Sequence, residues 1–536
     1  MLLGITLLTV AVISAQESEF DSFINQFGVL SADEAPIEDE GSETEDYRVG
    51  TEDDLTFGFA NGNAGASAPL SVAISGEASA SAEVFLDELA STEKMKQIEL
   101  GDFFSGSLNF FAQASNNAEA VINMKLSHRT PILTFDEAYV RGYFGPLSVE
   151  AGLRKLTWGK ADSLGPLDVV NPLDYTDLLD MTSVLDRKIA VPMIHLSYGI
   201  GTYSKLEAVF VPSFTPQRFA QLGDRWAPSQ LTSTPSAIKA GATAYVTEKT
   251  SNPQFENDPI LAGVFSDMEK MLLASMPSHP SYKSPDTPVE WLKYMQAGLR
   301  FTTTVKSADV GVQGYFGRLP RPVSVLTGFT DVWDGFNANT FYILSENEQK
   351  QYFADYKPTV FFDYNYFAQL GFDYAQELLG FNTRAELAVN LTKDLKGDDG
   401  EVYNPFIGWS LGFDRDIAVK DVLLFNVNLQ VNENVRLFSD KINDNRALDT
   451  EAGSNDTATR VTLIASRKFF REEFEINFTG LWGVEDMDFY VIPGLVWAKE
   501  NLAVRLNAGV FFGNSDGELG QYHNNNFIRM VMTYTF

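Results

Sequence analysis

A histidine and a serine stand two positions apart in the stretch IHLSYG, where His195 and Ser197 share one face of an expected strand. A base beside a hydroxyl nucleophile is the arrangement that covalent hydrolysis requires. The same alternation places Ile194, Leu196 and Tyr198 on the other, apolar face. If that apolar face meets lipid, His195 points away from any lipid substrate, which weakens the hydrolytic interpretation.

Other catalytic sets are not indicated by the sequence. Outer-membrane phospholipases carry a similar His-x-Ser followed by Asn, whereas Tyr198 stands at that position here. Three further histidines occur, His128, His279 and His523, and no two of the four stand at a zinc-ligand spacing. Cysteine is absent, which excludes thiolate chemistry and disulfides. We therefore expect no enzyme activity, no resident metal and no cofactor.

Four aspartates follow one another in the segment 158–189, and carboxylates are the ligands that hard cations prefer. They are Asp162, Asp168, Asp174 and Asp177. Their spacing lacks the Gly and the terminal Glu of an EF-hand loop. The same segment alternates Pro and Gly turns with Leu and Val, which is too apolar for a freely solvated loop. We favour a loop that folds back against the rest of the protein, with calcium binding as the alternative.

The elements that hold these residues are predicted to be strands, because apolar and polar residues alternate through most of the chain after residue 66. In DVLLFNVNLQVNENV, four amides share one face. The segments NLAVRLNAGVFFG, EFEINFTGLWG and NTRAELAVNLT repeat the pattern over about the 9 to 11 residues that a tilted membrane strand needs. Many such segments, apolar outside and polar inside, are typical of a closed antiparallel transmembrane β-barrel. A soluble propeller would need a repeat of about 40–50 residues, which the sequence lacks.

The links between these segments alternate in length, as in outer-membrane barrels with short periplasmic turns and longer external loops. Short links fall at 115–117, 145–146, 199–202, 306–309, 377–382, 416–421, 470–473 and 498–501, and most links between them are longer. This parity predicts about 18 strands, with 16 as the alternative. It also places both termini on the periplasmic side.

Composition favours the same class of protein. The 536 residues include 41 Phe and 20 Tyr, which suit strands and interfacial aromatic girdles. Beyond the start of the chain, no uncharged apolar run approaches the roughly 18 residues of a membrane helix. The net charge of −32 argues against a phosphate-binding surface, so nucleic acid is not an expected partner.

Composition and residue patterns divide the chain into three regions. Residues 1–15 have the apolar stretch and small-residue end of a secretory signal peptide. Residues 16–66 are acidic and lack a strand pattern, which predicts a flexible periplasmic leader. The barrel is predicted to span 67–536 and to close on the strand FIRMVMTYTF. Its last residues, Tyr534 and Phe536, resemble the terminal signal that barrel-assembly machinery recognises, which makes this machinery an expected partner beside the outer-membrane lipids.

One hairpin and the loop after it resemble a known family. The stretch EAYVRGYFGPLSVEAGLRKLTWGKADSLGPLDVVNPLDYTDL, residues 137–178, is similar to the DUF1302-type and related porin-like outer-membrane proteins. The matching positions are Glu137, Ala138, Tyr139, Gly145, Gly152, Trp158, Gly159, Asn171, Pro172 and Asp174. The family's Gly-Arg-Gln appears here as Gly152-Leu153-Arg154-Lys155, an offset that predicts a β-bulge. The resemblance implies an outer-membrane barrel, with passage of hydrophobic or lipid-like compounds as one implied role.

Polar side chains on the inner faces are predicted to line a path for solutes. Opposite charges on adjacent strands can instead pair across the ladder and stabilise the wall, and both interpretations stay open. The predicted lining residues are Glu137, Tyr139, Arg141, Glu150, Arg154, Arg384, Glu386, Asn426, Asn428, Arg505 and Arg529. The loop at 158–189 is predicted to narrow the path through Trp158, Lys160, Asp162, Asp168, Asn171 and Asp174.

These patterns favour an outer-membrane channel or facilitated transporter for small solutes, and they indicate no oligomeric state. A hydrophobic cargo is one option, because DPILAGVFSDMEKMLLASM predicts a Met-rich helix that either packs within its own loop or captures apolar solutes. A second helix is expected at 345–353, where Ser345 and Glu348 form a capping-box pair. The alternative function is a surface-binding protein or adhesin with a plugged barrel. The Met-rich helix carries its apolar side chains at Ile260, Val264, Met268, Met271 and Leu272.

Overall fold

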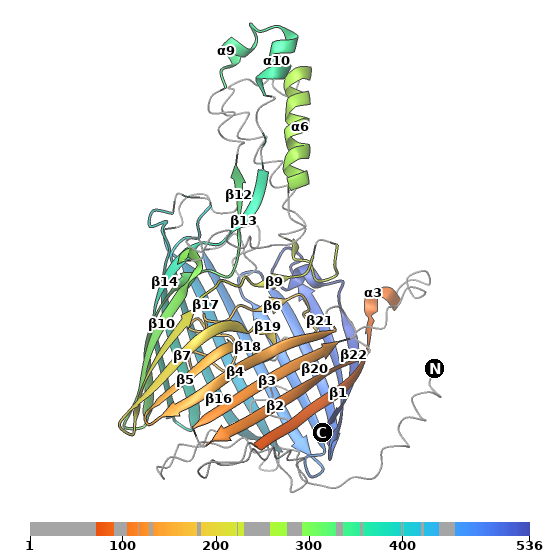
Figure 1. The fold of residues 1–536 in the computed structure, drawn as a ribbon. Coiled ribbons are helices and arrows are strands. Elements are labelled where there is room, and N and C mark those ends of the chain that lie inside the picture. The colour runs from red at the N-terminus through yellow and green to blue at the C-terminus, as the bar shows by residue number, and fades with distance from the viewer. Residues whose placement is uncertain are drawn as a thin grey trace, which may run out of the picture.

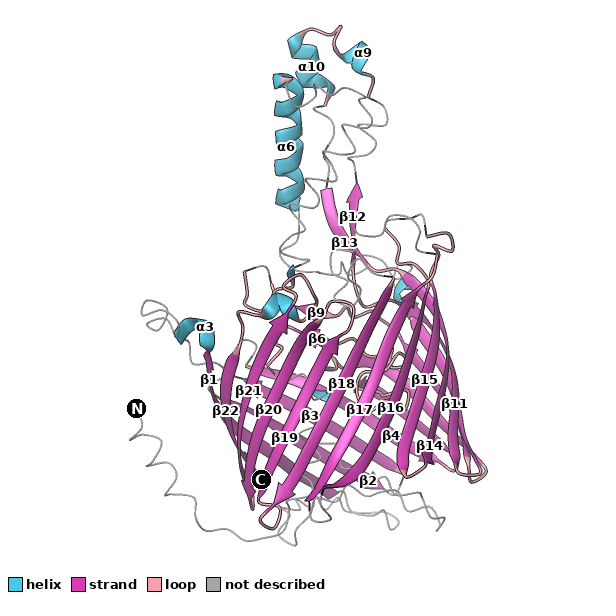
Figure 2. Cartoon of the chain, turned by 180° about the vertical axis from the view of Figure 1, so that it is seen from behind, coloured by secondary structure: helices cyan, strands magenta, loops and turns pink. Residues whose placement is uncertain are grey.

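The chain folds into a closed ring of 18 antiparallel strands, with helices and a separate hairpin beyond one end (Figure 1, Figure 2). The computed structural model describes residues 71–89, 104–115, 117–127, 132–179, 184–221, 223–229, 258–275, 292–327, 336–353, 357, 359–397, 399, 401–419, 423–438 and 456–536. The expected signal peptide and acidic leader lie outside these residues. The prediction of an all-β antiparallel barrel with about 18 strands is confirmed.

Each strand of the ring pairs with the next along the chain, and β22 pairs back with β1. A ring closed in this way has no unpaired edge strand. The strands are β1 (Ser71–Phe85), β2 (Ser105–Ser115), β3 (Ala118–Ser127), β4 (Leu133–Phe144), β5 (Leu147–Arg154), β7 (Val191–Ile200), β8 (Ser204–Val211), β10 (Gln296–Val305), β11 (Ala308–Arg318), β14 (Tyr366–Leu378), β15 (Phe381–Leu391), β16 (Phe406–Val419), β17 (Leu423–Arg436), β18 (Thr457–Phe469), β19 (Phe474–Gly483), β20 (Asp488–Lys499), β21 (Leu502–Gly513) and β22 (Phe527–Thr535).

The closing contact involves the last residue of the chain. The β1–β22 register runs from Glu77 opposite Thr535 to Phe85 opposite Phe527. Beyond it, the backbones of Gly76 and Phe536 exchange two hydrogen bonds of 2.9 Å each. The segment FIRMVMTYTF therefore forms the closing strand, as its alternation predicts.

The two faces of the ring differ in polarity. On β15, Glu386 and Asn390 are 3% and 2% exposed, whereas Leu387 and Leu391 on the outer face are 46% and 42% exposed. This contrast recurs around the ring, because successive residues of a strand point to opposite faces. An apolar exterior around a polar interior is the pattern of a barrel that spans a lipid bilayer. Within the described segments, no helix has the length and apolarity needed to cross a membrane.

The two ends of the ring differ in the length of their connections. At the end where the chain terminates, neighbouring strands are joined by short turns (Figure 1). Several of these turns use left-handed backbone at their tips, including Gly145, Gly201, Lys306, Leu379 and Glu500. Most connections at the opposite end, called here the loop end, are longer, so the predicted alternation of link lengths is confirmed.

Several elements rise beyond the loop end and are called here the tower (Figure 1). They are the hairpin of β12 (Val323–Thr327) and β13 (Thr359–Asp363), and the helices α6 (Pro259–Ser275), α9 (Ala338–Phe341) and α10 (Glu346–Tyr352). The helix predicted from the Met-rich segment is therefore present as α6, where Met268 is buried and Met271 is exposed. The predicted capping box is also present, because the Glu348 carboxylate accepts hydrogen bonds from the Ser345 backbone N–H and hydroxyl at 2.9 and 2.6 Å.

The predicted β-bulge at 152–155 is wrong. Pairing of β4 with β5 is regular from Ala138–Leu153 to Phe144–Leu147, and β5 stays in register with β7 to Arg154. The register shifts instead between β3 and β4, at Asn123 and Met124. The extra residue at this shift is Asp136 on β4. The remaining short elements are α3 (Leu86–Leu89), α4 (Val184–Arg187), the 3-10 helices η3 (Leu292–Tyr294) and η5 (Gly520–Tyr522), and the parallel pair β6 (Asp174–Tyr175) and β9 (Arg218–Phe219).

Candidate functional site

The connection between β5 and β7, residues 155–190, is called here the inner loop, and its described residues 155–179 and 184–190 include several that pack against the inner wall of the ring. Its Trp158 is 1% exposed and meets the Tyr315 ring of β11 edge-on, with ring centroids 6.4 Å apart. Leu156 and Val170 belong to the same buried cluster, together with Val209 of β8. The apolar residues that make this loop unsuited to water are therefore buried against the inner wall.

The carboxylate of Glu386 on β15 holds the first part of the inner loop. Its oxygens accept hydrogen bonds from the backbone N–H groups of Lys160, of Ala161 at 2.8 Å and of Leu167 at 3.3 Å. Gly159 allows this close approach, since its φ of 104° is left-handed and a Cβ there would collide with the carboxylate. One buried acid thus satisfies three backbone donors of a loop more than 200 positions away in the sequence.

A second polar contact fixes the same loop to neighbouring strands. Asp162 pairs with Arg384 of β15 and accepts a 2.7 Å hydrogen bond from Asn428 of β17. Arg384 also lies 3.0 Å from Asp414 of β16. The guanidinium therefore joins the loop carboxylate to a wall carboxylate.

Side-chain amides from four strands complete the attachment. Gln313 on β11 donates to the Leu167 carbonyl at 2.9 Å, and Gln369 on β14 donates to the Pro166 carbonyl at 3.0 Å. On β17, the Gln430 oxygen accepts from the Ser163 N–H at 2.9 Å, and Asn432 donates to the Leu164 carbonyl at 3.0 Å. Gln369 also donates to Asn390 of β15 at 2.9 Å. An amide both donates and accepts, so it can satisfy either polar group of a backbone.

The two ends of the inner loop are joined by buried side chains. The Lys188 ammonium lies 2.7 Å from Asp168 and donates to the Leu156 carbonyl and the Thr157 hydroxyl. Asn171 accepts from the Leu156 N–H at 2.7 Å and donates to the carbonyls of Arg154 and Ile189. The two ends of the inner loop are therefore held together by contacts within the loop itself, in addition to its contacts with the wall.

Charged side chains on neighbouring strands form a second group, called here the charged wall. The Glu150 carboxylate is its centre, with Arg141 Nε at 2.6 Å, His195 Nδ1 at 2.8 Å and Arg154 in contact. His195 Nε2 lies 3.3 Å from Glu207, and Arg141 reaches Glu119 at 3.4 Å. Opposite charges thus alternate across β3, β4, β5, β7 and β8. The members of the charged wall are Glu119, Arg141, Glu150, Arg154, His195 and Glu207.

A further buried ion pair spans an intervening strand. Arg300 on β10 and Asp373 on β14 lie 2.8 Å apart, although β11 runs between them. The position between the two is Gly311, where a Cβ would lie 2.3 Å from the Asp373 carboxylate. The absence of a side chain at this position lets the ion pair form over the strand.

The structure places the predicted lining residues on the inner faces of their strands, where several contact each other. Glu137 accepts from the Lys155 N–H, and Tyr139 lies under the Arg154 guanidinium. Asn426 donates to Asp416, and Arg529 lies 3.8 Å from Glu83. Of the predicted loop residues, Lys160 and Asp162 contact the wall, Asp168 and Asn171 join the ends of the loop, and Asp174 lies near Arg218.

The residues proposed for hydrolysis or for a cation are not assembled. Both ring nitrogens of His195 face carboxylates, so neither is directed to Ser197. Asp162, Asp168 and Asp174 each contact a different basic residue, and Asp177 accepts from the Leu179 N–H. Across the part of the chain that the structure describes, no group of three or more His, Cys, Asp or Glu side chains could hold a metal ion.

Several residues that hold the inner loop were not among the predicted site residues. Gln313, Gln369 and Lys188 make loop contacts, and Arg300 and Asp373 form the ion pair over Gly311. Alternation in DVGVQGYFGR and YFAQLGFDYA puts the two glutamines on inner faces. Which inner-face amide meets the loop depends on strand register, which alternation leaves undetermined.

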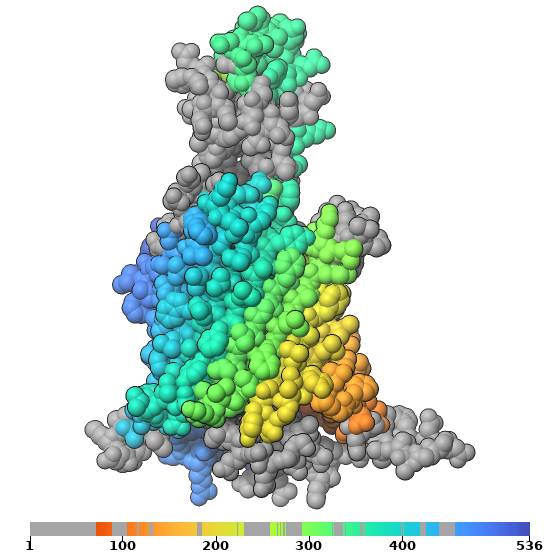
Figure 3. Space-filling view, turned by 90° about the vertical axis from the view of Figure 1, so that its left-hand side faces the viewer, coloured from red at the N-terminus to blue at the C-terminus, as the bar shows by residue number. Residues whose placement is uncertain are grey.

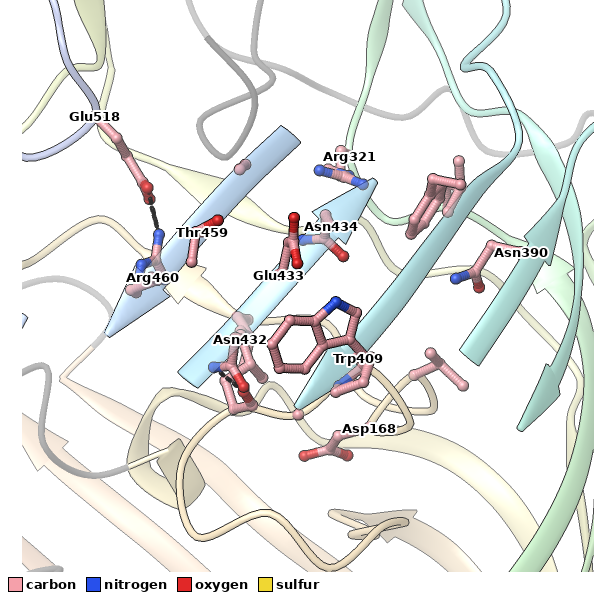
Figure 4. A pocket seen from close by; sticks show the side chains of 18 of the residues that line it. Asp168, Arg321, Asn390, Trp409, Asn432, Glu433, Asn434, Thr459, Arg460 and Glu518 are labelled. Atoms are coloured by element: carbon pink, nitrogen blue, oxygen red, sulfur yellow. Dashed lines mark hydrogen bonds and ion pairs between the residues drawn. The ribbon is translucent and has the colours of Figure 1, made fainter. Parts of the chain in front are cut away.

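A hollow of about 170 Å³ lies between the inner loop and the wall, toward the loop end (Figure 4). The inner loop bounds one side through residues such as Pro166 and Val169, and strands β14 to β18 bound the other. Asn390, Asn432 and Asn434 line it, together with Arg321 and Arg460 (Figure 4).

Comparisons with known proteins give one family and a set of barrel structures. DcaP, an outer membrane channel of Acinetobacter baumannii, is 9% identical over 87% of this chain and 97% of its own, with a TM-score of 0.37. OccK11 (OpdR) of Pseudomonas aeruginosa is 8% identical over 87% of this chain and 95% of its own, with a TM-score of 0.39. Wzi of Escherichia coli, a carbohydrate-binding β-barrel, is 8% identical over 86% of this chain and 84% of its own, with a TM-score of 0.37.

These similarities are too distant to transfer a function. No curated protein matches the chain. A family model, described as "Protein of unknown function (DUF1302)", matches residues 76–459, which is more than half of the chain. The sequence resemblance in the β4–β5 hairpin is thus confirmed over a much longer stretch, and the chain belongs to the DUF1302 family.

Proposed function

We propose that the protein is a channel of the bacterial outer membrane through which small solutes pass. The inner loop carries this proposal, because it narrows the interior of a large ring without being free to leave the wall. A barrel of about 16 to 18 strands encloses an aqueous passage, whereas one of about 8 is filled by its own side chains. A fixed loop inside such a ring sets the size and chemistry of the narrowest point.

The outer surface supports placement in a membrane. Ile194, Leu196 and Tyr198 on β7 are 45%, 38% and 46% exposed, whereas His195 on the inner face is 5% exposed. Lipid cannot satisfy backbone hydrogen bonds, and the closed ladder satisfies them within the ring. Under this proposal the short turns face the periplasm and the tower faces outward, while residues 1–15 direct export. Tyr534 and Phe536 then serve as the signal for barrel assembly.

The buried contacts favour polar rather than apolar cargo. Of the α6 residues that were candidates for capturing apolar solutes, Met268 is 3% exposed and Met271 is 45% exposed, while the adjacent Leu261 is fully buried in the tower. The inner faces of the ring carry amides, hydroxyls and paired charges. A polar solute that replaces its hydrogen bonds to water with hydrogen bonds to such a wall loses little free energy on entering the ring.

A surface-binding protein with a plugged barrel is the second candidate. The tower favours it, because an assembly of helices and a hairpin beyond the loop end offers a large surface to a partner (Figure 3). Aromatic packing of Phe336, Phe341 and Phe353 gives this assembly a core of its own. In this alternative the inner loop closes the barrel rather than narrowing it.

Single-channel recording in planar lipid bilayers separates the two functions. The folded protein is expected to produce stepwise currents, and their absence from a correctly folded sample would overturn the channel. Permeability of sodium relative to chloride then tests whether the acidic chain favours cations. We propose no catalytic role, since the His195 ring is engaged by Glu150 and Glu207.

A further inference from the structure

The hollow beside the inner loop has charged residues at its margin, and these are engaged by the protein itself. Arg460 contacts both carboxylate oxygens of Glu518 (Figure 4). Asp168 lies 2.7 Å from Lys188. The Arg321 guanidinium lies over the rings of Tyr403 and Phe406, at 5.2 and 5.5 Å from their centroids. A charged ligand would have to displace these contacts, which disfavours it.

The carboxylates at the outer margin are engaged in the same way. Glu485 accepts hydrogen bonds of 2.7 Å from the backbone N–H and from the hydroxyl of Thr459. Asp486 accepts from the Glu518 N–H at 3.3 Å. Glu433 follows Asn432 on β17, so alternation turns its side chain to the outer face. The charges near the hollow therefore do not specify an ion.

Two amides of the hollow, Asn390 and Asn432, use only part of their capacity for hydrogen bonds. Asn390 accepts one from Gln369, and Asn432 donates one to Leu164 and accepts one from Gln430. A side-chain amide has two N–H donors and an oxygen with two lone pairs, so each of these residues can make further contacts. A hydroxyl both donates and accepts, which makes it a matching partner for such amides.

An inner-face position without a side chain lets the inner loop and an amide pack closely at one side of the hollow. Gly408 on β16 lies between β15 and β17, opposite Asn434, and a Cβ there would lie 3.0 Å from the Asn434 oxygen and 2.8 Å from Pro166. Ala458, the small residue opposite Asn434 on β18, also lines the hollow. Phe406 supplies an apolar surface at one side. Amides around a small cavity with one aromatic surface suit a ring that carries hydroxyls on its edge and C–H groups on its faces.

We propose that this hollow binds a neutral solute with several hydroxyl groups, of the size of one sugar ring, on the loop side of the constriction. This inference rests on the proposed channel function and names the class of its cargo. The volume of about 170 Å³ is below the roughly 300 Å³ of ordinary ligand pockets, so the site takes one ring at a time. Weak binding next to the narrow point raises the local concentration of such solutes without trapping them.

Ligand-observed NMR titration of the detergent-folded protein tests the site with D-glucose as the probe. Wild type is expected to bind glucose, and Asn434→Leu is expected to weaken the dissociation constant at least tenfold because it removes amide contacts to the sugar. Ala458→Trp, which fills the hollow, is expected to abolish binding. The matched control is Asn507→Leu, which removes a buried inner-face amide on β21, away from the hollow, and is expected to bind as wild type does.

The outcomes separate this inference from the channel itself, since the titration needs no current. Absent glucose binding, equal weakening by Asn507→Leu, or tighter binding of glucuronate than of glucose would each overturn the inference. Glucuronate has the same ring with a carboxylate, so its preference would assign the hollow to anions. Stepwise currents without glucose binding would leave the channel standing, whereas glucose binding without currents would support the hollow and overturn the channel. Far-UV circular dichroism of each variant confirms that the strands have formed.

Discussion

Two parts of the inner wall are equally polar in sequence but differ in what their side chains contact. In the charged wall, Glu150 is surrounded by Arg141, Arg154 and His195 from the same and neighbouring strands. On β11, β14, β15 and β17, called here the docking wall, Glu386 and the amides contact the backbone of the inner loop. In the charged wall, side chains of opposite charge pair with each other. In the docking wall, the carboxylate and the amides instead bind the loop backbone, whose N–H groups need acceptors and whose carbonyl groups need donors.

This difference indicates which residues stabilise the ring and which define the passage. Loss of a member of the charged wall should weaken the barrel and leave the inner loop in place. Loss of a member of the docking wall should weaken the attachment of the loop, most of all at Glu386, and leave the barrel intact. The predictions below test this division, beginning with the largest expected effect.

Glu386→Leu is expected to release the inner loop, because three backbone N–H groups lose their acceptor. Each buried donor left without a partner costs about 1–3 kcal/mol, so docking should weaken by roughly 3 kcal/mol or more. Single-channel conductance should rise, and proteases should cleave within 155–190. Glu475→Leu is the control, since Glu475 is equally buried on β19 but accepts its hydrogen bond from Asn477 rather than from the loop. An unchanged conductance in Glu386→Leu would contradict a docking role.

Glu150→Gln is expected to destabilise the barrel and leave conductance unchanged. The substitution removes the negative charge between Arg141 and Arg154, whose like charges then face each other. Removing one partner of a buried ion pair costs about 3–5 kcal/mol, and the partial exposure of Arg141 reduces this to roughly 2 kcal/mol. Urea unfolding in lipid vesicles measures the change. A conductance as high as that of Glu386→Leu would show that the two walls are not separate in function.

Gly311→Ala is expected to break the Arg300–Asp373 pair by steric collision. The new Cβ would lie 2.3 Å from the Asp373 carboxylate, and such overpacking costs about 1–3 kcal/mol. The matched control is Gly314→Ala on the same strand, where the nearest atoms would lie 3.9 Å away. Equal unfolding midpoints for the two variants would show that Gly311 is not needed for the pair to form.

Gln430→Leu should have the smallest effect on docking. It removes the acceptor of the Ser163 N–H, and an ordinary hydrogen bond contributes about 1 kcal/mol. Hydrogen exchange at Ser163 should accelerate about fivefold, while Glu386 continues to hold Ala161 and Leu167. Release of the whole loop would mean that the amides, rather than Glu386, dominate docking.

Much of the fold could be predicted from the sequence. Alternation along β17 correctly placed Asn426, Asn428, Gln430 and Asn432 on one inner face, and link lengths correctly predicted the strand number. The capping-box pair Ser345 and Glu348 correctly predicted the start of helix α10, because the two residues are only three positions apart in the sequence. The bulge predicted at 152–155 was wrong, because β5 stays in register with both β4 and β7, and the register shift lies at Asp136 of β4, just before the motif.

The candidate site was predictable in composition and not in its contacts. The segment 158–189 was expected to fold back because of its apolar residues, and Trp158 and Val170 are indeed buried. Its partners, Glu386 and the amides of β11, β14 and β17, lie 146 to 268 positions away. Sequence spacing carries no information about such pairs, because strand register and the path of the loop place them together.

The sequence by itself determined a ring of strands with an inner and an outer face, because residues two apart point the same way and lipid accepts only apolar side chains. Tertiary structure alone decided that the polar interior divides into a charged wall and a docking wall. Ring closure sets which strands are neighbours, and only then can Asp373 reach Arg300 across Gly311 or Glu386 meet the backbone of the inner loop. The physical reason is range: side-chain alternation is local, whereas ion pairs and loop docking depend on distances between strands far apart in the chain.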